Sequence, residues 1–156
     1  MATRECWAKA RFDAEQFWNL ADGPARVVAD SAVTDDMLNG RNVILYGNAD
    51  TNTTWARLLD GSPVNVRTGS VTIGERQLDG EDLVMVFVQP LAGDREGLVA
   101  AVGTSGPRAR RIAWRLPTTD PAQELPDWMV VDSSSMATGV RDSGRFNRHW
   151  APVSRP

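Results

Sequence analysis

Short apolar runs that end at glycine, proline or polar residues recur along the chain and predict buried strands. The runs are Asn42–Tyr46, Leu83–Val88, Leu98–Val102 and Trp128–Val131. They are apolar at nearly every position instead of alternating with polar residues. Strands covered on both faces have this pattern, and parallel sheets are its usual setting.

Other apolar residues recur at three- and four-residue spacing and predict helices. The first helix is expected over residues 3–22, where one stripe is formed by Trp7, Ala10, Ala14, Phe17, Trp18 and Ala21. It is expected to end at Gly23-Pro24, because glycine suits a left-handed cap and proline cannot continue a helix. A shorter helix is expected to end at Leu59, and a third to run from Pro107 to Leu116.

The alternation of strands and helices predicts an α/β fold, namely a mainly parallel open sheet flanked by helices in the three layers of flavodoxin- or Rossmann-like proteins. Residues 64–82 differ, because apolar and polar positions alternate there and Gly69, Gly74 and Gly80 interrupt them. This pattern predicts a β-hairpin excursion at the edge of the sheet. Arg26–Ala29 is a short strand candidate, and Ser31–Gly40 an acidic, helical connection.

Composition limits the function classes. The 156 residues, 42% hydrophobic and 24% charged, are expected to form a single α/β domain over residues 1–156. The net charge of −3 gives no footprint for nucleic acid, and no apolar run is long enough to span a membrane. Cys6 is the only cysteine, which excludes an internal disulfide and a cysteine-based zinc site. No metal or cofactor is predicted, and the chain shows no signal peptide, so it is expected in the cytoplasm.

Two loops, at residues 47–52 and 103–107, are expected to leave strands at the same rim of the sheet and to enter helices. Such loops offer backbone N–H groups to anions. A small polar ligand, or a small anion or nucleotide, could bind there through side chains of the loops and of the basic helix that follows: Asn48, Asp50, Thr51, Asn52, Thr104, Arg108 and Arg111. Neither loop has the glycine spacing of a dinucleotide fingerprint or the lysine of a P-loop. Helix caps and turns, with a solvated arginine face, are the alternative interpretation.

Ser105 lies between a buried strand and a helix, as the nucleophile of an α/β-hydrolase does. Asp127, Asp132 and the single histidine, His149, follow it in the order serine, aspartate, histidine. A serine nucleophile needs a base, and His149 is the only imidazole in the chain. Pro107 occupies the position where the nucleophile motif requires glycine. Chance order is therefore the competing explanation.

The segments RNVILYGNADTNTTWARLL and GEDLVMVFVQP, with WAKARFDAEQFW before them, carry a family resemblance. From about Trp7 to about Trp150 the chain resembles the C-terminal α/β domain of bacterial, planctomycete-type peptidases described as prolyl-oligopeptidase-like and α/β-hydrolase-type. In that family a strand and a glycine-containing loop precede the helix that matches residues 3–22, and the nucleophile lies upstream. The resemblance therefore implies no catalytic residue in this chain. Ser105 and His149 depart from the family pattern.

These observations leave three functional hypotheses. The first is an accessory or ligand-binding domain, related to a hydrolase family and without a complete catalytic site, whose partner is a hydrolase domain or a second copy of itself. The alternative is a minimal serine hydrolase, an esterase, that uses Ser105, His149 and either Asp127 or Asp132. The third is a small-anion or nucleotide binder. None involves nucleic acid or a membrane, although the resemblance leaves open that relatives are exported.

Overall fold

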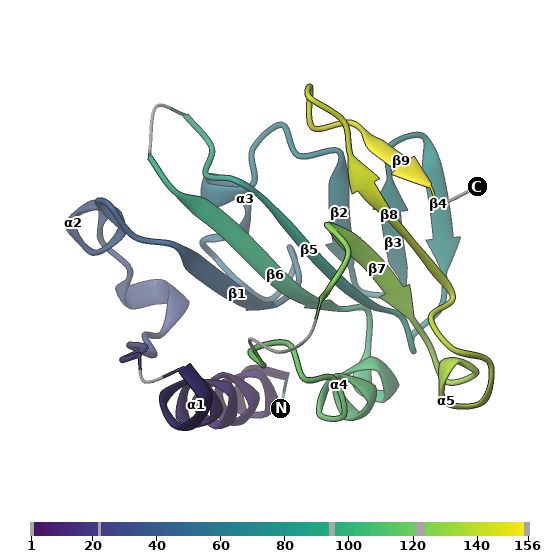
Figure 1. The fold of residues 1–156 in the computed structure, drawn as a ribbon, viewed down its shortest axis with the longest axis horizontal. Coiled ribbons are helices and arrows are strands. Elements are labelled where there is room, and N and C mark those ends of the chain that lie inside the picture. Colours follow the sequence, from purple (N-terminus) through teal and green to yellow (C-terminus); the bar gives the residue numbers. More distant parts are fainter. Residues whose placement is uncertain (1, 22, 94–95, 121–123, 155–156) are drawn as a thin grey trace.

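A six-stranded mixed sheet forms the centre of the computed structural model, which describes residues 2–21, 23–93, 96–120 and 124–154. In spatial order its strands are β1 (Val43–Gly47), β6 (Leu98–Thr104), β5 (Val84–Pro90), β7 (Trp128–Val131), β8 (Asp142–Phe146) and β9 (Pro152–Ser154) (Figure 1). Only β1 and β6 run parallel, and every other neighbouring pair is antiparallel.

A second sheet and the helices cover the two faces of this sheet. The second sheet is antiparallel and contains β2 (Val64–Arg67), β3 (Ser70–Ile73) and β4 (Arg76–Asp79). It packs on one face together with the short helix α3 (Trp55–Leu58). The other face is covered by α1 (Ala2–Ala21) and α4 (Pro107–Ala113). A connecting segment with η1 (Asp30–Ala32) and α2 (Asp35–Leu38) lies beyond β1, and α5 (Ser135–Thr138) follows β7.

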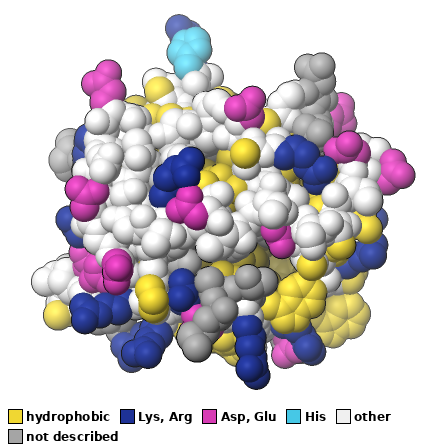
Figure 2. Space-filling view, turned by 180° about the vertical axis from the view of Figure 1, so that it is seen from behind, with side chains coloured by type: hydrophobic (Ala, Val, Ile, Leu, Met, Phe, Trp, Pro, Cys, Tyr) yellow, Lys and Arg dark blue, Asp and Glu magenta, His cyan; other side chains and the backbone are white. Residues whose placement is uncertain are grey.

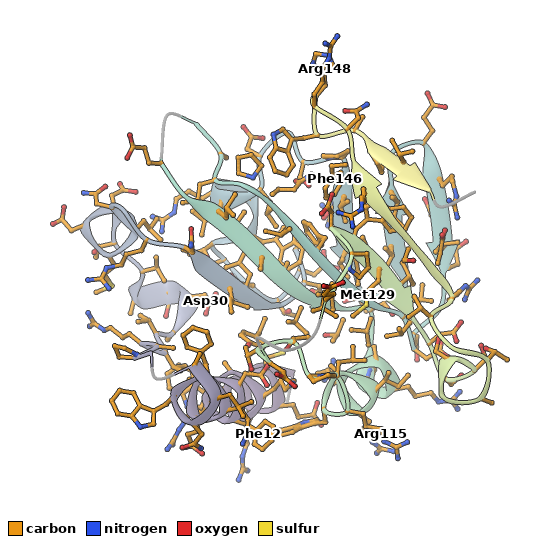
Figure 3. All side chains as sticks on the ribbon, viewed as in Figure 1. Phe12, Asp30, Arg115, Met129, Phe146 and Arg148 are labelled. Carbon is orange, nitrogen blue, oxygen red and sulfur yellow. The ribbon has the colours of Figure 1, made fainter. Side chains whose placement is uncertain are left out.

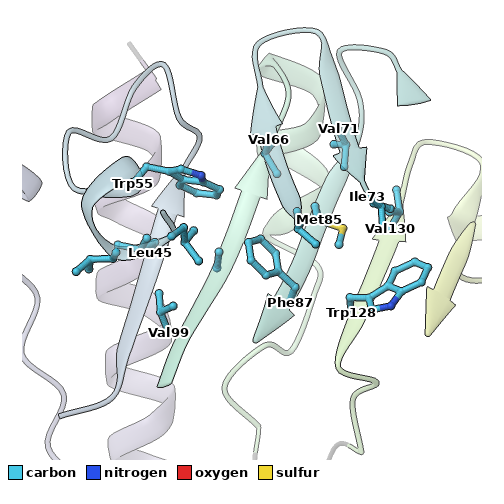
Figure 4. Close-up of a cluster of buried hydrophobic side chains, with 14 of the residues drawn as sticks. Leu45, Trp55, Val66, Val71, Ile73, Met85, Phe87, Val99, Trp128 and Val130 are labelled. Atoms are coloured by element: carbon cyan, nitrogen blue, oxygen red, sulfur yellow. The ribbon is translucent and has the colours of Figure 1, made fainter. Parts of the chain in front are cut away.

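The hydrophobic core is divided by the six-stranded sheet. The larger part lies between the two sheets, where Phe87 and Trp128 are fully buried and Trp55 packs edge-on against Phe87 (Figure 4). The smaller part lies under α4 and includes Val102 and Val131. Strands β5, β6 and β7 therefore have apolar residues on both faces, as their continuous apolar runs predict.

The predicted fold class is wrong: the molecule is not a parallel, Rossmann-like three-layer structure. The prediction depended on the link between two-sided burial and parallel pairing. Here the same burial arises because the small sheet covers the face opposite the helices, so antiparallel strands are also enclosed. Residues 64–82 do form antiparallel hairpins, but as a separate sheet packed across a face and not at the edge of the main sheet.

The remaining predicted segments have mixed outcomes. A helix spans the first predicted helical region, and β7 has the predicted bounds Trp128–Val131. Residues 26–29 form no strand, although Ala29 has an extended backbone. Strands β8 and β9 and helix α5 occur in a tail whose sequence has little apolar periodicity. No helix within the described ranges combines the length and apolar character needed to cross a bilayer.

Gly103 sets how closely the two sheets approach. A Cβ atom at this position would lie 2.6 Å from Val66 Cγ2 of β2. We predict that Gly103→Ala lowers the free energy of unfolding by about 1–3 kcal/mol, because the overpacked side chain separates the sheets. In a Val66→Ala background the same change should cost at least about 1 kcal/mol less, since the clashing methyl is gone. Equal costs in both backgrounds, measured by urea denaturation, would contradict this account of the packing.

Candidate functional site

The loops at residues 47–52 and 103–107 lie side by side, at the end of the sheet where β1 and β6 finish. Gly47 pairs with Gly103, so the parallel strands finish at the same level. The buried Asn48 then donates a hydrogen bond from its side-chain nitrogen Nδ2 to the carbonyl oxygen of Thr104, at 2.9 Å. The structure thus brings the two loops together at one rim.

Most polar groups of these loops are satisfied within the protein. Asn48 Oδ1 accepts hydrogen bonds from the Asp50 amide and from the Thr51 hydroxyl, both at 3.0 Å. The side chain of Asn52 bridges the Tyr46 carbonyl and the amide and hydroxyl of Thr54. These contacts are those of turns and helix caps.

The loops also join the two sheets. The Asp50 carboxylate accepts hydrogen bonds from Arg67 Nη1 at 2.6 Å and from the Thr68 amide at 2.8 Å. The amides of Ala49 and Gly69 donate across the same interface, to the carbonyl oxygens of Val66 and Ser105. Because their polar groups hold β2 and β3 against the rim, the loops act here as a structural joint.

Arginines of α4 and of the turn that follows it form an exposed outer face. Arg108, Arg111 and Arg115 are exposed and have no ion-pair partner among the residues that the structure describes. Arg110, on the side toward α1, pairs with Glu5. The first turn of α4 is closed by the Glu81 carbonyl, which accepts from the Ala109 amide. A small recess of about 10 Å³ lies between Gly47, Thr104 and Arg110.

The structure separates the residues of the proposed triad into two groups. Ser105 is fully buried, and its Oγ accepts a hydrogen bond from the Leu83 amide at 3.0 Å. Asp132, at the same end of the sheet, is bound by Arg141 and by the serines that follow it. Asp127 lies at the opposite end and accepts from the Phe146 amide at 2.9 Å.

His149 lies far from Ser105, in the turn between β8 and β9. The register places Asp142 level with Gly103, and β8 then continues away from Ser105 to Phe146. Six residues along the strands and three strand spacings across them amount to about 20 Å and about 14 Å. The imidazole projects from the surface and accepts a hydrogen bond from its neighbour Arg148 (Figures 2 and 3). It cannot act as a base for Ser105.

A different feature has the dimensions of a binding site: a groove of about 980 Å³ between α1, β1 and the connecting segment before β1. One wall is the helical stripe Trp7, Ala10, Ala14 and Phe17. The floor is the outer edge of β1, and the far wall consists of residues 24–38. We call this feature the α1–β1 groove.

Large apolar side chains of the α1–β1 groove are exposed. Trp7 is 40% exposed, Phe17 36% and Ile44 46%. Hydrophobic side chains gather on the surface at the lower right of Figure 2. Trp18 and Leu20 of α1 are also exposed. Exposed apolar patches of this kind commonly mark interaction sites.

A buried polar cluster closes the groove on the side toward α4. Lys9 Nζ lies 2.6 Å from Asp13 Oδ1, and Asp13 Oδ2 accepts a hydrogen bond from the Tyr46 hydroxyl at 2.9 Å. Burial and the neighbouring Asp13 carboxylate raise the pKa of Tyr46 far above its usual value, so the phenol remains a proton donor. Burial likewise raises the pKa of the Cys6 thiol, which makes it a poor nucleophile at neutral pH.

The far wall is fixed by two contacts with the region around α3. Asp30 accepts hydrogen bonds from the amide and hydroxyl of Thr53, at 2.6 and 2.7 Å. Arg57 Nη2 donates to the Val33 carbonyl at 3.2 Å. These contacts fix the position of the wall relative to α3.

Sequence reasoning did not identify the α1–β1 groove, although two of the predicted ligand-binding residues, Thr51 and Asn52, line it. The sequence does show the apolar stripe of α1, but amphipathic periodicity predicts that such a stripe is buried against the rest of the protein. Among the side chains of α1 whose burial is described, the buried ones are Lys9 and Asp13, at 4% and 2% exposure. The available signal was the pair Lys9 and Asp13, whose opposite charges lie four residues apart on one face of the helix. The adjoining face carries the aromatic residues Trp7 and Phe17. No group of three or more potential metal ligands occurs among the described residues.

Asp50 provides a pH-dependent test of the joint between the sheets. The hydrogen bond from the Thr68 amide, opposed by partial burial and aided by Arg67, lowers the pKa of Asp50 in the folded protein. The resulting stabilisation is present above the unfolded pKa of about 4 and is lost as the pH falls through the lower folded value. We predict that Asp50→Asn destabilises the protein at pH 6 and that the difference from the unsubstituted protein shrinks by pH 2.5.

Urea denaturation at both pH values measures this effect. Asp60→Asn is the matched control, because Asp60 is exposed and has no hydrogen-bond partner within the described ranges. If the free energies of unfolding of Asp50→Asn and the unsubstituted protein differ by the same amount at both pH values, the charge of the Asp50 carboxylate does not stabilise the joint.

Comparison with protein-family models, curated protein sequences and solved structures gives no match. Function must therefore be argued from the geometry and chemistry of the site itself. The α1–β1 groove is the candidate site on that basis.

Proposed function

We propose that this domain is a binding module without a catalytic site of its own and that the α1–β1 groove is its binding site. One observation carries the proposal: the apolar stripe of α1 faces a groove of about 980 Å³ instead of the sheet. Such a volume is at the upper end of the range for ligand pockets. Filling it would remove Trp7, Phe17 and Ile44 from water, and burying a large apolar side chain is worth about 1.5–3 kcal/mol.

The chemistry of the groove supports binding rather than catalysis. Three of its titratable groups are engaged within the protein: Asp13 is paired with Lys9, Tyr46 donates to Asp13, and Asp30 accepts from Thr53. The groove has no histidine, and its one thiol has a raised pKa. With Ser105 buried and His149 distant, no observation favours the esterase hypothesis.

The resemblance to the C-terminal domain of prolyl-oligopeptidase-like peptidases agrees with this role. A domain of that kind would accompany a hydrolase and contribute contacts, not catalytic residues. We therefore propose an accessory role beside a hydrolase-type partner, supported by the motifs around Tyr46 and Gly80.

Filling the groove should abolish binding of apolar ligands. We predict that the protein binds 1-anilinonaphthalene-8-sulfonate, a dye that reports exposed hydrophobic surface. Ala14→Trp, which places a large side chain on the groove wall, should weaken binding at least tenfold in a fluorescence titration. Ala8→Trp, an exposed position of α1 outside the groove, should leave binding unchanged. Equal dye binding by both variants would refute the groove as the site.

The absence of a catalytic site is tested separately. We predict that the purified protein, Ser105→Ala and His149→Ala release p-nitrophenol from p-nitrophenyl acetate at the same rate, because Ser105 and His149 do not meet. A rate that falls at least tenfold in both variants would instead establish the esterase.

A further inference from the structure

We infer that the occupant of the α1–β1 groove is an extended apolar segment of a partner polypeptide, which pairs with the outer edge of β1 as an additional strand. This inference rests on the proposed function and names the chemistry of its ligand. It begins with the backbone of β1, because the side chains of the groove would accept many apolar molecules.

The outer edge of β1 has no strand beside it in the part of the chain that the structure describes. The strand pairs with β6 on its other side only. The Tyr46 carbonyl, at its carboxyl end, accepts a hydrogen bond from the side-chain amide of Asn52. Alternate N–H and C=O groups of an edge strand point away from its sheet and are available for pairing.

These backbone groups distinguish a polypeptide from other apolar ligands. A lipid or an apolar small molecule in the groove would cover the edge and leave its N–H and C=O groups without partners, which is costly in an apolar environment. An extended backbone supplies donors and acceptors at the spacing of β1. This is recognition by strand addition, in which main-chain hydrogen bonds supply affinity and side-chain pockets supply specificity.

The walls specify apolar side chains on both faces of the added strand. On the α1 side the segment would meet Ala10, Ala14 and Phe17. On the other side it would meet Val33 and Leu58. Successive side chains of a strand point to opposite faces, so consecutive residues would all contact apolar surface. Because β1 has five residues, a matching segment is a continuous apolar run of about five residues, roughly 16 Å long.

The shape of the groove favours a single strand over the edge of a second copy. The connecting segment with η1 and α2 lies beyond β1, so the edge is enclosed between this segment and α1 (Figure 1). Asp30 and Arg57 fix the segment there. A folded sheet carries its own covering layers and would collide with this wall, whereas one extended chain can enter.

Charges on the groove favour acidic residues beside the apolar run. Arg26 and Arg41 line the groove, are exposed and have no ion-pair partner within the described ranges. Of the three aspartates that line the groove, Asp13 and Asp30 have partners, and Asp36 has none among the described residues. The unpaired charge is therefore net positive. A carboxylate on the partner segment would complement it, with the modest gain of an exposed ion pair.

The test uses a fluorescein-labelled peptide with the apolar run Val-Ile-Val-Leu-Val between two glutamates, and fluorescence polarisation with the 156-residue protein. Two further peptides carry N-methyl groups at the odd or at the even positions of the run. Since only alternate N–H groups of an added strand face β1, one N-methylated peptide should bind at least tenfold more weakly and the other within threefold of the parent. Ala14→Trp should abolish binding, Ala8→Trp should not, and a lysine-flanked peptide should bind two- to fivefold more weakly.

Each other result has a definite meaning. If both N-methylated peptides bind as well as the parent, or both lose binding equally, strand addition is overturned. If no peptide binds but the dye binds and Ala14→Trp displaces it, strand addition is overturned and the binding function stands. If neither the peptide nor the dye responds to Ala14→Trp, both proposals fail. A dimer in sedimentation velocity that Ala14→Trp dissociates would assign the groove to a second copy and overturn the inference.

Discussion

The buried ion pair between Lys9 and Asp13 attaches α1 to the six-stranded sheet and determines which side chains of this helix are exposed. A buried ion pair is favourable only when further hydrogen bonds satisfy its charged groups. Here Lys9 Nζ also donates to the Leu116 carbonyl, and Asp13 accepts from the hydroxyls of Tyr46 and Thr118. The network fixes the rotation of α1 about its axis. With its polar contacts turned inward, the helix directs Trp7, Ala10, Ala14 and Phe17 toward the groove.

This arrangement leaves the two halves of the main sheet unequal. Strands β5, β6 and β7 have neighbours on both edges and cover on both faces, so their residues are held by packing from every direction. Within the described ranges, strand β1 has a neighbouring strand on one edge only. Exposed strand edges invite pairing with other chains, and proteins commonly protect them with charges, bulges or covering loops. In this molecule the α1–β1 groove lies between β1 and the segment that contains η1 and α2. One extended chain can therefore reach the exposed edge of β1.

Sequence patterns located the core strands well, because burial on both faces leaves a continuous apolar run such as Trp128–Val131. They did not give the direction of pairing, since the same run results whether helices or a second sheet supply the cover. A constraint was nevertheless present: the connection from Val88 to Leu98 is too short for the crossover that parallel neighbours need, and β5 and β6 pair antiparallel. Strands β8 and β9 were missed because they are short and lie near the edge, where alternate positions stay polar.

The candidate site was less predictable than the fold. The loops that begin at Gly47 and Gly103 do meet, as expected from two strands that end together, but their polar atoms bind one another and the small sheet. The separation of Ser105 from His149 depends on the direction of three successive strands, which no local pattern encodes. The groove depends on which face of α1 packs against the sheet. That orientation is fixed by hydrogen bonds to Asp13 from Tyr46 and Thr118, which lie more than thirty residues away in the sequence.

Amide hydrogen exchange of β1, resolved residue by residue by NMR, tests the central claim most directly, because it reports whether the outer edge of this strand is open. An open edge predicts alternation along residues 43–46: amides that point to β6 are protected, and amides that point to the groove exchange orders of magnitude faster. Residues 99–103 of β6, with strands on both sides, should be protected throughout. Uniform protection of the β1 amides in the isolated protein would show that the edge is already covered and would contradict the account.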